Sequence, residues 1–367
     1  MTRVALVTLG RANANGEVRR VASWRRLWEH VGAEVDVIPL AHSRRVHTDG
    51  IRQVLAGQAV PERLAWSGQA LLAEIERLDP DVVVCITARA YEPALRAHVP
   101  VVLLDFVDQL SRSYRDRSTI DRRALRSAAF RALSAAHARF ERVDHVPTHL
   151  RIAAGRTDAN ALPATWVPNL WDPTLEPIER QPDRDVIFFG TLDYAPNVAA
   201  IARLERLWPL VLARRPGTTA LIAGSRPSAT VEEVCVRNGW ELVRDYPSLA
   251  EVASRARIAV APLDHTAGIQ NKVLDAACLR LPQVVSGAAI AGFDAGFPLR
   301  GSVDDIEFAD RIVGLLDDPD LAVSELQATL AHIREVYTPA NWAAWADAAL
   351  ADARLRGLSS AQAGAAQ

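Results

Sequence analysis

Residues 256–278 read ARIAVAPLDHTAGIQNKVLDAAC and carry the clearest signal of the fold class. The apolar run at 258–263 predicts a buried strand, the polar loop after it contains Gly268, and a helical pattern starts near Gln270. A strand, a glycine-containing loop and a helix in this order form one repeat of an α/β fold with a parallel sheet. Because ligands of such folds bind at the carboxyl ends of the strands, this loop is also a candidate site.

The same alternation of apolar strands and helices extends along the chain in both directions. In the first half, strands are predicted at 4–9, 35–40, 81–86 and 99–106, with helices at 17–32 and 64–78. In the second half, strands are predicted at 186–190, 219–224, 241–243 and 258–263, with helices at 198–214, 230–238, 249–255 and 270–279. Continuous Val, Ile and Leu runs between helices indicate parallel sheets covered on both faces. The predicted class is α/β, with two Rossmann-like, doubly wound domains in tandem facing a central cleft.

The domain boundary is predicted from chain length and proline content. A chain of 367 residues is long enough for two ordinary domains. Residues 168–185 contain four prolines and many charges, which is typical of a linker between domains. We predict a first domain at 1–172, a second domain at 173–340, an Ala- and Trp-rich helix at 341–358 and a disordered tail at 359–367.

Composition and charge exclude several classes of protein. Apolar residues make up 49% of the chain, charged residues make up 23% and the net charge is −2, so global charge does not favour nucleic acid or membranes. No apolar run approaches the ~20 residues of a spanning helix, and the N-terminus does not resemble a signal peptide, so we expect a cytoplasmic protein. The three cysteines are far apart, which argues against a disulfide framework or a cysteine zinc site.

Lysine usage singles out one position. Of the 42 Lys and Arg residues, all except Lys272 are arginines. A coding bias toward arginine would spare a position that requires a compact ammonium. The alternative is that one lysine has survived by chance on a solvated face. Lys272 follows Gly268 at a predicted helix start, where exposed backbone N–H groups attract anions. Residues 267–275 therefore form a candidate cradle for a phosphate or diphosphate.

Other polar groups lie close to this cradle or follow neighbouring strands. Asp275 can accept hydrogen bonds from ribose hydroxyls, or it can pair with Lys272 and stabilise the helix start. Gly190 and Gly224 end two predicted strands, and Arg226 can bind a phosphate oxygen or lie on the surface. His265 either lines the sugar site or is a surface turn residue.

In the first half, two loops offer groups for a second substrate. The loop after the first strand contains two glycines and two asparagines suited to tight turns, namely Gly10, Asn13, Asn15 and Gly16. It lacks the G-x-G-x-x-G pattern, so a dinucleotide site is not indicated. Asp105 lies near the end of the strand at 99–106 and Asp108 just beyond it. Either can orient or deprotonate an acceptor hydroxyl, or cap the next segment.

The segment Arg112–Arg142 has an unusual charge. It contains nine arginines against three acidic residues. Such a patch can contact anionic lipid or an anionic acceptor, and a solvated helix face is the alternative.

Three segments together resemble a known family. They are DFVDQLS at 105–111, VIFFGTLDYAPNVAAIARLERLWPLVLARRPGTTALIAGSRP at 186–227 and ARIAVAPLDHTAGIQNKVLDAACLRLPQVVS at 256–286. They resemble glycosyltransferase family 4, and within it the bacterial sugar transferases of exopolysaccharide and exosortase-associated clusters. The resemblance covers about residues 100–295. It implies the GT-B fold, an acceptor-binding first domain, a nucleotide-sugar-binding second domain, and a C-terminal helix that crosses back to the first domain.

The resemblance also implies roles for individual residues. The donor diphosphate and sugar would be bound by Gly268, Ile269, Gln270, Asn271 and Lys272, and Asp275 stands where the family typically has a Glu that holds the ribose. The chain departs from the family pattern at three places: Ala267 replaces a Glu that contacts the donor sugar, Leu170 replaces the Gly of Pro-Asn-Gly, and 191–194 lack the usual Arg and Lys. These departures leave the donor sugar open and permit an inactive homologue.

The implied activity is a hexosyltransferase-like reaction. A sugar would pass from a UDP, GDP or dTDP donor to an acceptor hydroxyl with retention, in the biosynthesis of a glycan or a glycosylated small molecule. Lys272, Asp275, Asp105 and Asp108 are the expected catalytic residues, and no metal or other cofactor is expected because Lys272 and the helix start supply positive charge. The alternatives are a GT-B nucleotide-sugar epimerase, which needs no acceptor, and an inactive GT-B partner subunit.

Overall fold

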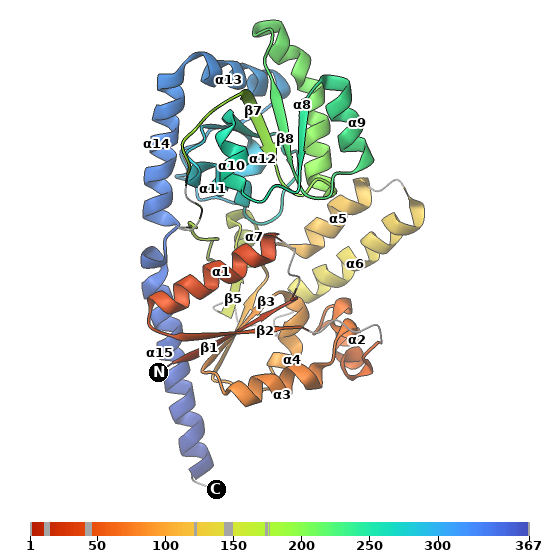
Figure 1. Cartoon of the computed structure of the whole chain (residues 1–367). Coiled ribbons are helices and arrows are strands. Elements are labelled where there is room, and N and C mark those ends of the chain that lie inside the picture. Colours follow the sequence, from red (N-terminus) through yellow and green to blue (C-terminus); the bar gives the residue numbers. More distant parts are fainter. Residues whose placement is uncertain are drawn as a thin grey trace. The chain divides into compact units, whose positions relative to one another are not determined.

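A computed structural model describes residues 2–10, 15–40, 46–120, 123–142, 150–172, 175 and 177–365. The chain divides into two compact units (Figure 1). Unit 1 comprises Met1–Leu170 and Thr338–Gln367, and unit 2 comprises Trp171–Tyr337.

Unit 1 contains a six-stranded parallel sheet in the order β2-β1-β3-β4-β5-β6. Its strands are β1 (Arg3–Thr8), β2 (Glu34–Pro39), β3 (Val82–Ile86), β4 (Val101–Asp105), β5 (Arg151–Ala153) and β6 (Thr165–Trp166). The strand order reverses between β1 and β3, so the loops that leave these two strands diverge and leave a crevice at the carboxyl edge, as in other doubly wound sheets. Val82, Val83 and Val84 are fully buried, as expected for a strand covered on both faces.

The described helices of unit 1 include three that the sequence predicted and five that it did not. They are α1 (Asn15–His30), α2 (Ile51–Ala56), α3 (Gly68–Leu78), α4 (Tyr91–Ala94), α5 (Leu110–Ile120), α6 (Ala124–Arg142), α7 (Arg156–Ala161) and α15 (Pro339–Ala365). The three predicted helices are α1, α3 and α15. The ring centroid of Trp345 on α15 lies 5.7 Å from Trp24 and 6.0 Å from Trp28, both on α1. The C-terminal helix therefore completes the core of unit 1 through aromatic packing.

The C-terminal helix extends further than the predicted end at 358, because α15 continues to Ala365. Residues 359–367 are rich in alanine and contain no proline. Extending an existing helix over such residues costs less free energy than nucleating a new one, so the helix continues beyond its Trp-rich part.

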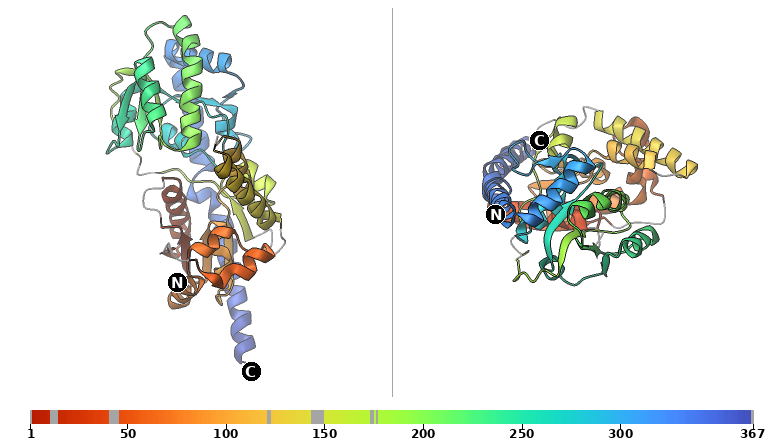
Figure 2. Two further views of the ribbon diagram at one scale, coloured as in Figure 1. Left: turned by 90° about the vertical axis from the view of Figure 1, so that its right-hand side faces the viewer. Right: turned by 90° about the horizontal axis from the view of Figure 1, so that it is seen from above.

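Unit 2 contains a second six-stranded parallel sheet, in the order β12-β11-β10-β7-β8-β9. Its strands are β7 (Arg184–Phe189), β8 (Ala220–Gly224), β9 (Glu241–Arg244), β10 (Ala256–Ala261), β11 (Gln283–Ser286) and β12 (Gly301–Ser302). Its helices are α8 (Ala195–Arg214), α9 (Ala229–Asn238), α10 (Leu249–Ser254), α11 (Asn271–Cys278), α12 (Gly287–Ile290), α13 (Asp305–Asp317) and α14 (Pro319–Val336). Helices lie on both sides of this sheet (Figures 1 and 2). The predicted doubly wound α/β class is confirmed.

The strand order of unit 2 determines where a ligand site can form. The order reverses between β7 and β10, which pair in parallel through Val186 and Ile258. The loop after β7 and the loop between β10 and α11 leave the sheet at this point, and a crevice forms between such loops. These two loops are residues 190–194 and 262–270, and the sequence placed 191–194 and 264–269 of them outside its predicted strands and helices.

Candidate functional site

Lys272 lies at the point where the strand order of unit 2 reverses. Its Nζ donates a 2.7 Å hydrogen bond to Oδ1 of Asn197 and lies 4.1 Å from the ring centroid of Phe188. Phe188 belongs to β7, and Asn197 belongs to the first turn of α8, where Pro196 stabilises the helix start. The two elements that flank the loop after β7 therefore hold the ammonium from two sides.

The surroundings of Lys272 contain little compensating charge. Among the described residues, no carboxylate forms an ion pair with its ammonium. Burial disfavours the charged form and lowers the pKa of Lys272 to about 7, although the charge of Asp275 opposes the shift. A half-buried ammonium with neutral partners can be stabilised by an anionic ligand.

Glycines let the loops around Lys272 approach one another. A Cβ atom added to Gly190 would lie 2.8 Å from Nδ2 of Asn197 and 3.6 Å from Nζ of Lys272. A Cβ atom on Gly224 would lie 1.8 Å from the carbonyl oxygen of Gly190. Gly268 has a φ of +67°, and its carbonyl oxygen would lie 2.2 Å from a Cβ on Gly292. Side chains are thus excluded from the positions where loops cross beside the ammonium.

The start of α11 has no side-chain cap. Gln270 is the N-cap residue, but its side chain makes no capping hydrogen bond, and its amide instead donates to the carbonyl oxygen of Ala267 at 3.4 Å. The N-terminus of this eight-residue helix carries Asn271 and Lys272, while Ile269 just before it is buried. Partial positive charge of the helix start therefore adds to that of the ammonium.

The other predicted donor residues are spread around this centre. His265 is exposed, and Asp275 is half-buried one turn beyond Lys272. Arg226 forms an exposed ion pair with Asp193 at 3.0 Å, so its guanidinium already has a partner on the loop after β7. A phosphate would have to compete with Asp193 for Arg226.

Sequence reasoning missed three side chains at this edge. Asn197 and Phe188 contact the ammonium directly, and burial with the charge of Asp275 raises the pKa of Tyr246 to about 12. Asn197 lies 75 residues from Lys272 along the chain. Neither an Asn in a helix start nor a Phe in an apolar strand carries a sequence signal for such a site.

In unit 1, Asp105 has a structural environment. It is fully buried, and its Oδ2 accepts hydrogen bonds from Nε of Arg20 at 2.5 Å and Nε1 of Trp24 at 2.6 Å. Its Oδ1 accepts from the backbone N–H of Val107 at 2.9 Å. This placement argues against the predicted role of Asp105 at an acceptor hydroxyl and agrees with the capping alternative.

Asp108, three residues later, has a different environment. It is half-buried, and its carboxylate accepts no hydrogen bond from any described residue. Burial and the nearby charge of Asp158 raise the pKa of Asp108 to about 6, although Arg89 and Arg117 oppose the shift. A carboxyl group that titrates close to neutral pH is suited to proton transfer.

Next to Asp108, four side chains form a hydrogen-bonded cluster. The carboxylate of Glu62 contacts Nε2 of His137 at 3.0 Å, the hydroxyl of Tyr114 at 2.7 Å and a guanidinium nitrogen of Arg89 at 3.4 Å. Burial alone would raise the pKa of Glu62, but His137, Arg89 and Tyr114 together lower it to about 2. The cluster holds Arg89 at the carboxyl end of β3, on the same edge as Asp108.

The predicted acceptor loop is only partly described. Asn13 lies outside the described residues, and Asn15 is the first residue of α1. Gly10 has a φ of +68°, and its N–H donates to Oγ1 of Thr8 and Oε1 of Glu17, both at 3.1 Å. A Cβ atom on Gly16 would meet nothing within 4 Å.

The arginine-rich segment forms α5 and α6, apart from residues 121–122, which are not described. Exposed arginines occur on both helices, at positions 115, 126, 131, 139 and 142, and the exposed Arg123 directly precedes α6. Leu125 is 88% exposed. The predicted basic surface is therefore helical. No helix in the described part of the chain combines the length and apolar character needed to cross a membrane.

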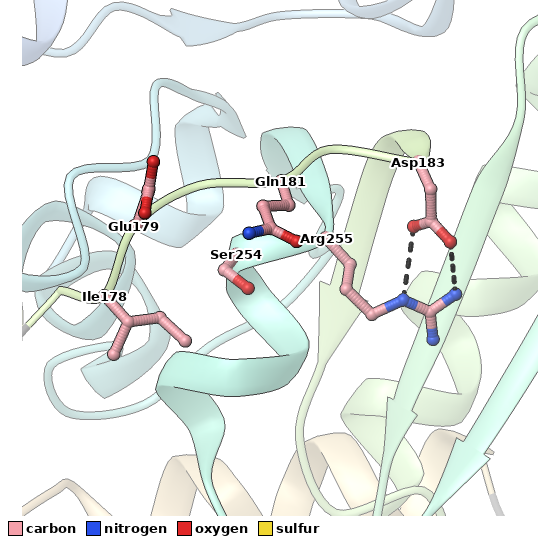
Figure 3. A pocket seen from close by; sticks show the side chains of 6 residues that line it. All are labelled: Ile178, Glu179, Gln181, Asp183, Ser254 and Arg255. Carbon is pink, nitrogen blue, oxygen red and sulfur yellow. Dashed lines mark hydrogen bonds and ion pairs between the residues drawn. The ribbon is translucent and has the colours of Figure 1, made fainter.

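A pocket of about 600 Å³ lies elsewhere in unit 2 (Figure 3). It is lined by Ile178, Glu179, Gln181, Asp183, Ser254 and Arg255. These residues precede β7 and β10, so the pocket lies at the amino ends of the strands, opposite Lys272. The guanidinium of Arg255 is paired with Asp183 and Glu241, as Figure 3 shows for Asp183. Within the described residues, no three His, Cys, Asp or Glu side chains form a group that could hold a metal ion.

Comparison with known proteins agrees with this architecture. Residues 183–318 match the family described as glycosyl transferases group 1, which places the match over most of unit 2. No curated protein sequence matches the chain significantly.

Several solved structures are similar over most of the chain. A glycosyltransferase from Rickettsia africae is 8% identical with a TM-score of 0.64, and the match covers 96% of this chain and 98% of that one. HepE of Anabaena, solved with UDP and glucose, is 12% identical with a TM-score of 0.62, covering 96% and 100%. A mutant of TarM from S. aureus, solved with fondaparinux, alpha-GlcNAc-glycerol and UDP, is 11% identical with a TM-score of 0.54, covering 78% and 57%.

These similarities confirm the fold that the sequence predicted. The two doubly wound sheets and the extent of the structural matches agree with one another. The chain therefore has the GT-B fold, and its second unit carries the sequence pattern of glycosyl transferases group 1.

Proposed function

We propose that this protein is a glycosyltransferase that moves a sugar from a nucleoside diphosphate sugar, bound by unit 2, to an acceptor hydroxyl, bound by unit 1. The observation that carries the proposal is the half-buried Lys272 ammonium at the carboxyl edge of unit 2, which Asn197 and Phe188 hold and which forms no ion pair with a carboxylate in the described part of the chain. The match of residues 183–318 to glycosyl transferases group 1 supports the same activity.

The chemistry of the leaving group explains why a cation is needed there. Breaking the bond at the anomeric carbon leaves negative charge on the diphosphate, and the Lys272 ammonium and the start of α11 would stabilise that charge. Positive charge from these groups is sufficient in this proposal, so no metal or other cofactor is included. The family resemblance supports retention at the anomeric carbon.

On the acceptor side, Asp108 is the residue we assign to the hydroxyl. Its half-buried carboxylate can accept a hydrogen bond from that hydroxyl and orient it, or take its proton. In the donor site, Asp275 is proposed to hold the ribose. HepE and TarM were solved with UDP, so UDP is the first diphosphate to test, followed by GDP, dTDP and ADP.

The acceptor class follows from the resemblance and the basic surface. We propose a role in the synthesis of an exopolysaccharide or another glycan, in the cytoplasm. The exposed arginines of α5 and α6 would bring unit 1 to anionic lipid, at ~1 kcal/mol or less for each basic residue. Co-sedimentation with anionic vesicles should decrease as salt increases, and its absence at low salt would remove the membrane from the proposal.

Calorimetric titration and thermal melting with the four diphosphates test the main proposal. A diphosphate at about 100 times its dissociation constant stabilises the folded state by ~2.7 kcal/mol, which raises the melting temperature by several degrees. If none of the four diphosphates binds, the proposed activity is wrong, and the alternative of an inactive partner subunit gains support. Conversion of a bound donor without any acceptor would instead favour the epimerase alternative.

A further inference from the structure

The side-chain amide of Asn197 is held at both ends. Its Nδ2 donates to the carbonyl oxygen of Thr191 at 2.8 Å, and its Oδ1 accepts from Nζ of Lys272 at 2.7 Å. A carbonyl oxygen can only accept a hydrogen bond and an ammonium can only donate one. These two partners therefore fix the positions of Nδ2 and Oδ1 in the Asn197 amide. Asn197 is 7% exposed, so water competes little for either bond.

The other neighbours of Lys272 leave few positions for its ammonium. The ring of Phe188 lies on one side, and a Cβ on Gly190 would lie 3.6 Å from Nζ. Among the described residues, Asn197 is the hydrogen-bond partner of Nζ, and Asp275 is the charged group that acts on it. The direction in which the ammonium points is thus set by one amide oxygen.

We propose, on the basis of the function proposed above, that Asn197 is a positioning residue that aims the Lys272 ammonium at the donor diphosphate while leaving its charge uncompensated. An amide oxygen accepts a hydrogen bond without cancelling the charge of the donor. A carboxylate at the same position would form a buried ion pair and compete with the diphosphate for the ammonium. An alanine would leave Nζ without its anchor.

The lone lysine allows a direct test that needs no ligand. Isotope labelling of lysine gives a single side-chain signal in nuclear magnetic resonance, from Lys272, in a full-length chain whose affinity tag lacks lysine. We expect the wild-type signal to titrate near the pKa of about 7. Asn197→Asp should raise this pKa by about one unit or more, because a carboxylate would lie next to Nζ, and Asn197→Ala should lower it.

Asn238 provides the matched control. It lies in the same unit, is half-buried and also uses both hydrogens of its amide, toward Glu205 and the carbonyl oxygen of Val234. Asn238→Asp should leave the lysine titration unchanged. Thermal melting checks that each variant is folded. If Asn197→Ala does not fold, Asn197→Asp still provides the test, because it keeps the shape of the side chain. Unchanged lysine titration in both Asn197 variants would overturn the inference.

UDP binding separates this inference from the proposed function. We expect both Asn197 variants to bind UDP about tenfold or more weakly near pH 7, with Asn197→Asp losing less affinity as pH rises. If the wild-type protein binds none of the diphosphates, the proposed function fails, whatever pKa is measured for Lys272. If wild type binds and the Asn197 variants bind equally well with the same pH profile, only the positioning role fails.

Discussion

Units 1 and 2 each place a charged side chain near the carboxyl end of a central strand. The charge in unit 1 is paired with an opposite charge, whereas the charge in unit 2 contacts neutral groups. Asp105 in unit 1 is fully buried and accepts hydrogen bonds from Arg20 and Trp24. Lys272 in unit 2 has an amide oxygen and an aromatic ring as partners. A buried charge that the protein already neutralises holds the fold together, whereas a charge with neutral partners is available to a ligand.

Breaking the Arg20–Asp105 pair should give the largest effect on stability. Arg20→Leu leaves the Asp105 carboxylate buried without its cation, and we expect the free energy of unfolding to fall by ~3–5 kcal/mol. Urea denaturation measures this. Arg77, which forms an ion pair with Glu74 on the surface of the same unit, is the control, and Arg77→Leu should change little. Equal losses in both variants would contradict the structural role of the buried pair.

Asp108 should behave in the opposite way to Arg20. Because the folded-state pKa of Asp108 is raised to about 6, its ionisation destabilises the folded protein as pH rises through that value. Asp108→Asn removes this charge, so the variant should melt at the same temperature as wild type or higher at neutral pH. Transfer should slow by about 100-fold or more, because an amide can accept a hydrogen bond from the hydroxyl but cannot take its proton. A stable variant with normal transfer would exclude Asp108 from the reaction.

Lys272 tests the other side of the comparison. Lys272→Ala should not lower stability, since it removes a cation whose burial is unfavourable, but it should weaken diphosphate binding. Loss of a charge-assisted hydrogen bond costs ~1.5–3 kcal/mol, or roughly ten- to more than a hundredfold in affinity. Lys272→Arg should not restore binding, because a planar guanidinium does not reproduce the position of the compact ammonium beside Asn197 and Phe188. Full activity of the arginine variant would mean that the lone lysine reflects coding bias.

The smallest expected effect is a change of diphosphate affinity with pH. A group whose folded-state pKa is lowered to about 7 loses its proton above that pH, and the bound diphosphate needs the protonated form. Affinity should therefore fall by up to about tenfold per pH unit above neutrality. Binding should take up a proton there, which calorimetry in buffers of different ionisation enthalpy detects. The dependence of diphosphate affinity on pH should be lost in Lys272→Ala. The same dependence in that variant would mean that another group titrates.

Secondary structure followed from the sequence where the apolar pattern was long. The strands predicted at 186–190, 219–224 and 258–263 correspond to β7, β8 and β10, and the helix predicted at 198–214 is α8 with an earlier start. The short strands β5, β6 and β12 have two or three residues, too few to show a period. The end of α15 was misplaced because a mildly polar, alanine-rich tail has the composition of both a helix and a disordered segment.

By itself, the sequence determined the α/β alternation, the loops in which to look for a site, and the importance of Lys272 as the lone lysine. It could not distinguish Asp105 from Asp108, because both follow the same apolar strand. Only the tertiary structure paired Asp105 with Arg20, gave Asp108 no such partner among the residues it describes, and brought Asn197 to Lys272 across 75 residues. Hydrophobic periodicity is a property of neighbouring residues, whereas the partners of a charge come from chain segments that meet only when the sheet and its helices have packed.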